Sequence, residues 1–182
     1  MSKSRTGLPA HLSVHSYTIV KNKDKLRQPS DALYDEEMIK RYSKVLRMRM
    51  LILGNKAVGL AGVQIGIPYR IFAVKLETIG NRIAVYVNPT IEAIKFPFSK
   101  ATEDNKGLWK IDSLEGCLSL KGEHKVKRYR SIVLRSSNNA TRGLQGTDAI
   151  RVQHEVDHLD GILITDRALN DRQKERKYNG NS

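Results

Sequence analysis

The stretch TDAIRVQHEVDHLDG, residues 147–161, decides the fold that the rest of the chain must support. It contains the pattern H-E-x-x-H, in which His154 and His158 stand four residues apart. On an α-helix this spacing places both imidazoles on one face, one turn apart, where they can bind a single metal ion. Glu155 follows the first histidine directly, so its carboxylate can reach a metal-bound water as a general base.

The neighbouring residues predict the helix itself. Thr147 is the expected N-cap, and Gly161 lies where the helix is expected to stop. An apolar stripe recurs at helical spacing and consists of Ala149, Val152, Val156 and Leu159. Ile150 and the two histidines fall on nearly the opposite side, so we expect a helix buried on both flanks, with its histidines facing a lined cleft. Chance spacing of two histidines is the competing explanation, and the intervening glutamate and the apolar residues around it count against chance.

Length and composition predict a single domain over residues 1–182. Within it, residues 1–25 are expected to form a flexible lead-in and residues 167–182 a short basic tail. Hydrophobic residues make up 40% of the chain and charged residues 28%, which favours a soluble globular protein. No apolar stretch is long enough to span a bilayer, so no membrane segment is expected.

Charge and cysteine content narrow the class of protein further. The formal net charge of +13 favours contact with polyanions such as RNA, although the basic residues are scattered and form no known nucleic-acid module. The single cysteine, Cys117, excludes a disulfide framework within the chain and suits a reducing compartment.

Hydrophobic periodicity and turn residues predict further elements along the chain. A helix is expected to begin at Ser30 or Asp31 and to end at Leu53. The expected extended segments are Arg70–Leu76, Arg82–Val87, Pro89–Ile94 and Ser131–Ser136, and the polar residues Phe96–Ile111 are expected to form a loop.

Two histidines need a third protein ligand if the metal is to keep an open position for water. The acidic residues downstream of the pattern look solvated; they are Asp160, Asp166, Asp171 and Glu175. Upstream, Cys117 lies in the sequence EGCLS, where Gly116 permits a tight bend that can turn a thiolate inward. A lone cysteine can also be an inert core residue or a nucleophile. Two imidazoles and one thiolate would leave a fourth position for water.

Three motifs together make the sequence resemble the peptide deformylase family. They are VGLAGVQ at residues 58–64, EGCLS at 115–119 and QHEVDH at 153–158, in the order and approximate spacing of that family. The resemblance covers most of the chain, from about Leu26 to Asp166. It implies an α+β fold in which antiparallel strands wrap around a central metal-binding helix that carries H-E-x-x-H.

The resemblance also implies roles for individual residues. The implied metal ligands are Cys117, His154 and His158, with Glu155 as the general base. Gln64 would donate its side-chain amide, and Leu118 its backbone N–H, to the developing oxyanion. Gly59 would pair with the main chain of the substrate, while Val58 and Ile150 would line the pocket for its methionine side chain.

The implied function is a metal-dependent hydrolase of protein biosynthesis that removes the N-formyl group from formyl-methionyl nascent peptides and releases formate. Fe²⁺ is the expected metal, with Zn²⁺, Ni²⁺ or Co²⁺ as alternatives. A cytoplasmic location is expected, or an organelle matrix, or the host cytoplasm if a virus encodes the chain. The basic surface or the C-terminal tail could contact the ribosome. Two alternatives remain at this stage: an H-E-x-x-H peptidase of another lineage, and a non-catalytic module that binds RNA or the ribosome.

The sequence departs from the common family pattern at four positions, one of which is Lys121, where the family often has proline after the EGCLS motif. Many members have glycine at the position of Ala57 and alanine at the position of Gly62. An altered fit of the substrate is expected from these two replacements. Arg151 replaces an apolar residue on the side of the helix that carries the histidines. Its expected partners are solvent or an acid such as Glu115 or Asp157, and it could narrow the choice of substrate.

Overall fold

The computed structural model describes residues 13–94 and 110–168. Its α-helices are α1 (Lys23–Leu26), α2 (Glu36–Leu53), α3 (Gly146–Leu159) and α4 (Ile164–Arg167), and its 3₁₀ turns are η1 (Val14–Ser16), η2 (Gly54–Lys56), η3 (Gly62–Ile65) and η4 (Glu77–Ile79). Its strands are β1 (Gly59–Ala61), β2 (Ile71–Leu76), β3 (Arg82–Val87), β4 (Thr90–Ala93), β5 (Lys110–Gly116), β6 (Glu123–Tyr129), β7 (Ser131–Arg135) and β8 (Arg142–Gln145).

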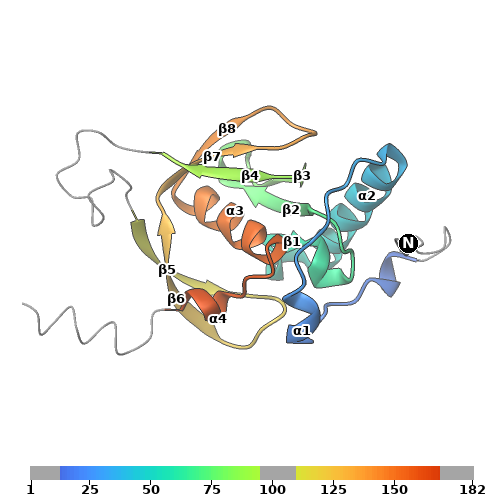
Figure 1. Cartoon of the computed structure of the whole chain (residues 1–182), viewed down its shortest axis with the longest axis horizontal. Helices are drawn as coiled ribbons and strands as arrows, with labels where there is room; N and C mark the ends of the chain where they lie inside the picture. Colours follow the sequence, from blue (N-terminus) through green and yellow to red (C-terminus); the bar gives the residue numbers. More distant parts are fainter. Residues whose placement is uncertain (1–12, 95–109, 169–182) are drawn as a thin grey trace, which may run out of the picture.

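Every pair of neighbouring strands within the described sheets is antiparallel. The strands form two three-stranded sheets, in the orders β1-β2-β3 and β4-β7-β8, and the two-stranded hairpin β5-β6. In Figure 1, α3 lies between the β4-β7-β8 sheet and the β5-β6 hairpin. Helix α3 contacts strands of all three groups, including β1, β2, β6 and β8. The predicted mixture of helices with antiparallel strands is therefore confirmed.

The apolar stripe of α3 forms part of the core. Its four members, Ala149, Val152, Val156 and Leu159, are all buried in one hydrophobic cluster. Phe72 and Val74 of β2 and Leu144 of β8 belong to the same cluster. Burying a valine, leucine or phenylalanine side chain contributes about 1.5–3 kcal/mol, so the cluster fixes α3 against the sheets. The opposite face of the helix is thereby turned toward the β5-β6 hairpin.

The helix predicted from Ser30 or Asp31 begins later than expected. Asp35 is the N-cap of α2, and its carboxylate accepts the backbone N–H of Met38 at 2.8 Å. The preceding residues are extended because distant backbone groups bind them: Ser30 N–H donates to the carbonyl of Leu159 at 2.8 Å, and Asp31 forms a bridge with Tyr69. The prediction of the helix start was wrong because these tertiary hydrogen bonds outweigh local propensity.

The start of α3 also differs from the prediction. Strand β8 runs to Gln145, and Gly146 has a φ of 56°, which turns the chain directly into the helix. Thr147 therefore lies inside the first turn and is not the N-cap. The predicted stop is confirmed, since the helix ends at Leu159 and Gly161 has a φ of 72°.

The remaining strand predictions are mostly confirmed. Strands β2 and β3 match the predicted segments to within one residue, and β4 and β7 lie inside theirs. Lys110 and Ile111 belong to β5 and not to the predicted loop. The rest of that loop from Phe96 lies outside the described residues, as do residues 1–12 of the lead-in and residues 169–182 of the tail. Residues 13–25 contain η1 and most of α1.

Candidate active site

Three side chains from two distant parts of the chain converge at the α3 face that is turned away from the core. His154 and His158 stand on α3, and Cys117 lies in the turn after β5. One potential ligand atom from each residue lies within 4.8 Å of the other two, an arrangement that could hold a metal ion. The sulfur of Cys117 is 3.3 Å from Nε2 of His158. Thiolate and imidazole are ligands that suit zinc and other first-row transition metals.

A buried ion-pair network orients the first of these histidines. Nδ1 of His154 is hydrogen-bonded at 2.9 Å to Oε2 of Glu115, so Nε2 is the ring nitrogen left for the cluster. Arg128 donates to both oxygens of Glu115, at 2.8 and 2.9 Å, and also to Asp157. Burial alone would raise the pKa of Glu115, but the bonds from His154 and Arg128 lower it to about 2. Glu115 is therefore ionised and fixes the ring of His154.

The surroundings of the two histidines shift their pKa values in opposite directions. Burial alone would lower the pKa of His154, but hydrogen bonds to Cys117 and Glu115 raise it to about 10. Burial lowers the pKa of His158 to about 3, so this imidazole is neutral and offers a free lone pair. A metal ion bound by the imidazole of His154 would displace the proton that this ring otherwise holds. The donor set therefore fits a divalent metal.

Glu155 lies beside the cluster in a confined position. The residue is 4% exposed, and Oε2 has no hydrogen-bond partner among the described residues. A Cβ atom added at Gly59 of β1 would lie 2.1 Å from Oε1, so only glycine leaves room for the carboxylate. Burial raises the pKa of Glu155 to about 7. A carboxyl group with this pKa can accept and return a proton near neutral pH.

The side-chain amide of Gln64 points at the same cluster from η3. Its Oε1 accepts the backbone N–H of Ala61 at 2.9 Å, which leaves Nε2 to donate toward Cys117 Sγ at 3.5 Å and Ser119 Oγ at 3.3 Å. Gln64 is 2% exposed. Leu118 follows Cys117 directly and packs against the core cluster on the α2 side. The structure therefore brings together both residues that sequence analysis assigned to the oxyanion.

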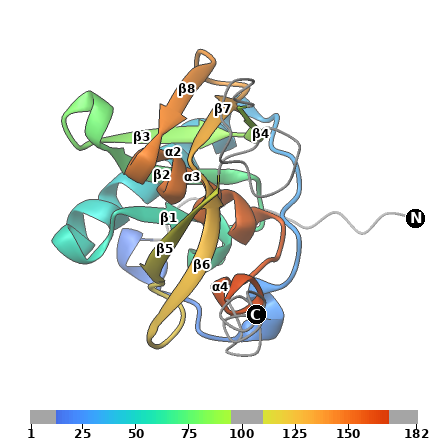
Figure 2. The same ribbon diagram turned by 90° about the vertical axis from the view of Figure 1, so that its left-hand side faces the viewer.

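A cleft of about 550 Å³ opens above these groups. One wall of the cleft comes from β1 and the segment before it, another from β5 and the turn after it, and the floor comes from α3. Figure 2 shows the β5-β6 hairpin in front of β1 and α3. The three residues predicted to bind substrate all line this cleft, and they are Val58, Gly59 and Ile150. Val58 is 48% exposed, so an apolar side chain is open to a ligand.

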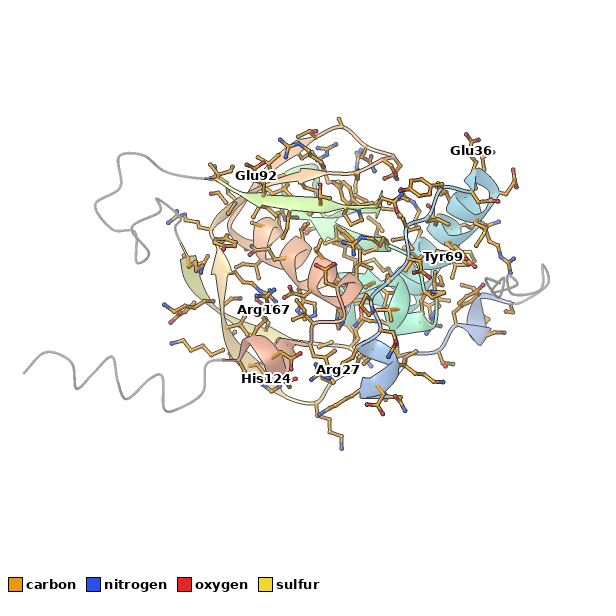
Figure 3. The ribbon with its side chains drawn as sticks, in the orientation of Figure 1. Arg27, Glu36, Tyr69, Glu92, His124 and Arg167 are labelled. Atoms are coloured by element: carbon orange, nitrogen blue, oxygen red, sulfur yellow. The ribbon has the colours of Figure 1, made fainter. Side chains whose placement is uncertain are left out.

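Sequence reasoning missed the buried partners behind the site. Arg128 is 3% exposed and joins Glu115 to Asp157. Arg167 of α4 also donates to Asp157, at 2.6 and 3.0 Å. Figure 3 labels Arg167 near α3. A period of two in β6 places Arg128 on the same buried face as Val126, a signal hidden by the neighbouring lysines.

Arg151 pairs with an acid, as predicted, but the acid is Glu77 and neither of the two that were named as examples. Its guanidinium donates to the carbonyl of Lys75 at 2.9 Å and to Glu77 at 3.0 Å. The expected partners Glu115 and Asp157 are both bound by other arginines, so the prediction of an Arg151 pair with either was wrong. Arg151 lines the cleft, but its charged group is held by β2 and η4.

Comparison with known proteins gives a consistent result. The family model described as polypeptide deformylase matches residues 16–175. Peptide deformylase 1 of Clostridium perfringens is 33% identical over 153 residues, which cover 74% of this chain and 94% of the relative. The crystal structure of peptide deformylase from Thermotoga maritima is similar with a TM-score of 0.69 and 27% identity, covering 85% of this chain and 98% of that one. The crystal structure of a probable peptide deformylase from Synechococcus phage S-SSM7 gives a TM-score of 0.67 and 29% identity, covering 83% and 99%.

A cleft that holds a potential metal site beside a buried carboxylate is typical of metal-dependent hydrolases. The chain belongs to the polypeptide deformylase family, whose members are enzymes that remove N-formyl groups from nascent peptides. This confirms the predicted family and activity, in place of a peptidase of another lineage or a non-catalytic module. Within the described part of the chain, no helix is long and apolar enough to span a membrane.

Proposed function

We propose that this chain hydrolyses N-formylmethionyl peptides with a divalent metal ion held by Cys117, His154 and His158. The convergence of their three ligand atoms within 4.8 Å, next to the carboxylate of Glu155, carries the proposal. When bound, such an ion supplies a Lewis acid that lowers the pKa of water and polarises a carbonyl group. Fe²⁺ remains the expected metal, with Zn²⁺, Ni²⁺ or Co²⁺ as alternatives.

Glu155 acts as the general base and then as the general acid. Its carboxylate takes a proton from the water that attacks the formyl carbon, and later returns it to the departing amine, so that formate and a free N-terminus result. Two features support this role: its pKa of about 7 and the absence of a described partner on Oε2. Burial also keeps bulk water from competing for this proton.

The amide of Gln64 and the N–H of Leu118 stabilise the negative charge that grows on the formyl oxygen. The bond from Ala61 N–H to Oε1 fixes the amide so that its N–H₂ group is directed at the cluster. A donor that is already oriented needs no reorganisation during the reaction, and losing one typically costs about 10²–10³ in rate.

The substrate main chain pairs with β1. On one side this strand pairs with β2, from Gly59 opposite Val74 to Ala61 opposite Phe72, while its other side borders the cleft. An extended peptide can add to such an edge through backbone hydrogen bonds. The methionine side chain would then lie against Val58 and Ile150.

We expect residues 1–182 to act as one catalytic domain in the cytoplasm. Contact with the ribosome through the basic surface stays a prediction, and residues 169–182 of the C-terminal tail, which could contribute, lie outside the described residues.

Formate release from formyl-Met-Ala-Ser tests the proposal, measured with and without a chelator. We expect chelation to abolish release and added metal to restore it. Glu155→Ala should retain the metal and lose activity, whereas the matched variant Glu36→Ala, at the exposed start of α2, should match the wild type. Release at the wild-type rate by Glu155→Ala would contradict the assignment of the base.

A further inference from the structure

A segment at the start of the described chain, Tyr17–Lys21, lies against both residues assigned to the oxyanion. The N–H of Val20 donates to the backbone carbonyl of Gln64 at 2.8 Å. Tyr17 is buried in the core cluster on the α2 side, and Ile19 packs against that same cluster, as does Leu118. These contacts anchor the segment, so the position of its last residue is defined by the core.

The ammonium group of Lys21 donates a hydrogen bond to the backbone carbonyl of Leu118. This carbonyl belongs to the peptide group whose N–H is that of Ser119. The Ser119 N–H in turn donates to the sulfur of Cys117 at 3.4 Å. One peptide group therefore connects the Lys21 cation on its oxygen side with the Cys117 sulfur on its hydrogen side.

Hydrogen bonds that share a peptide group reinforce one another. A cation on the carbonyl oxygen draws electron density from the amide nitrogen, which makes its N–H a stronger donor. The N–H of Ser119 and the amide of Gln64 both donate to the Cys117 sulfur. Hydrogen bonds to a ligating sulfur change the electron density that it offers to a metal. The charge of Lys21 can thus act on the sulfur without touching it.

We propose that Lys21 is a positioning residue that polarises the Leu118–Ser119 peptide group and thereby tunes the thiolate of Cys117. This inference rests on the proposed function, because it requires Cys117 to be a metal ligand. A purely structural Lys21 would only hold the N-terminal segment in place. The two roles differ in their readout, since only the first changes the electronic state of the sulfur.

The test uses the full-length protein loaded with Co²⁺, whose sulfur-to-cobalt charge-transfer absorption reports on the thiolate. Weaker hydrogen bonding raises the energy of the sulfur lone pairs, so Lys21→Met should shift this band to lower energy at unchanged cobalt content. Lys21→Arg keeps the cation and should leave the band close to the wild-type position. Lys23→Met, two residues further on at the exposed start of α1, is the matched control and should cause no shift.

The outcomes separate the inference from the proposed function. If the wild-type protein binds Co²⁺ without a charge-transfer band, Cys117 is not a ligand and the proposed metal site fails. If the wild type shows the band and Lys21→Met leaves it unchanged, the inference is overturned while the proposed function stands. A shift of equal size in Lys21→Arg or Lys23→Met would also overturn it. Thermal unfolding of each variant shows whether the fold is intact, and the Lys21→Arg protein provides the comparison should Lys21→Met unfold.

Discussion

Replacing Gly59 by alanine should displace the base without removing it. The added Cβ would lie 2.1 Å from Oε1 of Glu155 and 2.7 Å from its carboxyl carbon. Non-bonded atoms of this kind normally stay about 3.5 Å apart, so the carboxylate must move by roughly 1 Å. Because Glu155 is buried, it has little space to rotate into. The end of a side chain can still shift at lower cost than backbone, so the variant should fold.

The expected loss of activity follows from that displacement. A misplacement of about 1 Å at a reacting group can cost about 10²-fold in rate, or about 2.7 kcal/mol of transition-state stabilisation. We therefore expect kcat of Gly59→Ala on formyl-Met-Ala-Ser to fall by about two orders of magnitude, while metal content stays at the wild-type value. KM should also rise, because Gly59 borders the expected substrate edge of β1.

A control and a double variant make this prediction specific. Gly116 lines the same cleft, but a Cβ added there meets no atom within 4 Å, so Gly116→Ala should stay within about twofold of wild type. Glu155→Asp withdraws the carboxylate by one methylene and removes the closest of the contacts, so adding Gly59→Ala to it should cost less than it costs the wild type. Wild-type kcat in Gly59→Ala, or full additivity in the double variant, would refute the reasoning.

Three further substitutions address the surroundings of the cluster. Cys117→Ala should weaken Zn²⁺ binding by more than about 100-fold in a chelator competition, and unchanged affinity would exclude the thiol as a ligand. Glu115→Gln should cost about 10–100-fold in metal affinity because His154 loses its charged partner, whereas Glu92→Gln in an exposed pair should cost nothing measurable. Arg151→Val should leave peptide preference unchanged and lower the free energy of unfolding by about 1 kcal/mol, since its guanidinium binds β2 and η4; a changed preference in peptide profiling would contradict this.

The part of the site that lies on one helix could be predicted from sequence, because local geometry determines it. Four-residue spacing places His154 and His158 one turn apart in any α-helix, and Glu155 accompanies them. The apolar stripe on the other side then fixes which face is buried. By contrast, 36 residues lie between Cys117 and His154, and only the combination of three motifs indicated that they meet.

Interactions between distant segments set what the sequence could not show. Residues before α2 are extended because they bind the end of α3 and the residues before β2, and no local pattern contains that information. Arg128 reads as one more cation in a basic stretch, yet it is among the most buried polar residues described. Its role depends on two acids from other elements, Glu115 and Asp157, which stand in two of the three motifs, but nothing in those motifs points to Arg128.

Those acids create an excess of negative charge that the buried arginine cannot balance alone. Four groups that carry negative charge when ionised meet within or directly behind the cluster: Cys117, Glu115, Glu155 and Asp157. Arg128 and the half-exposed Arg167 compensate two of them. Uncompensated buried charge is costly, so the protein without metal is expected to take up protons in their place.

The perturbed pKa values follow that expectation. Hydrogen bonds to Cys117 and Glu115 overcome the effect of burial and raise the pKa of His154 to about 10, while burial raises that of Glu155 to about 7. A divalent ion would supply the two positive charges that the arginines leave missing, and it would release those protons as it binds. Glu155 would then be ionised when a substrate arrives, which is the state that a general base requires. The acids behind the cluster thus favour the binding of a divalent cation, and that cation in turn favours the ionised form of Glu155.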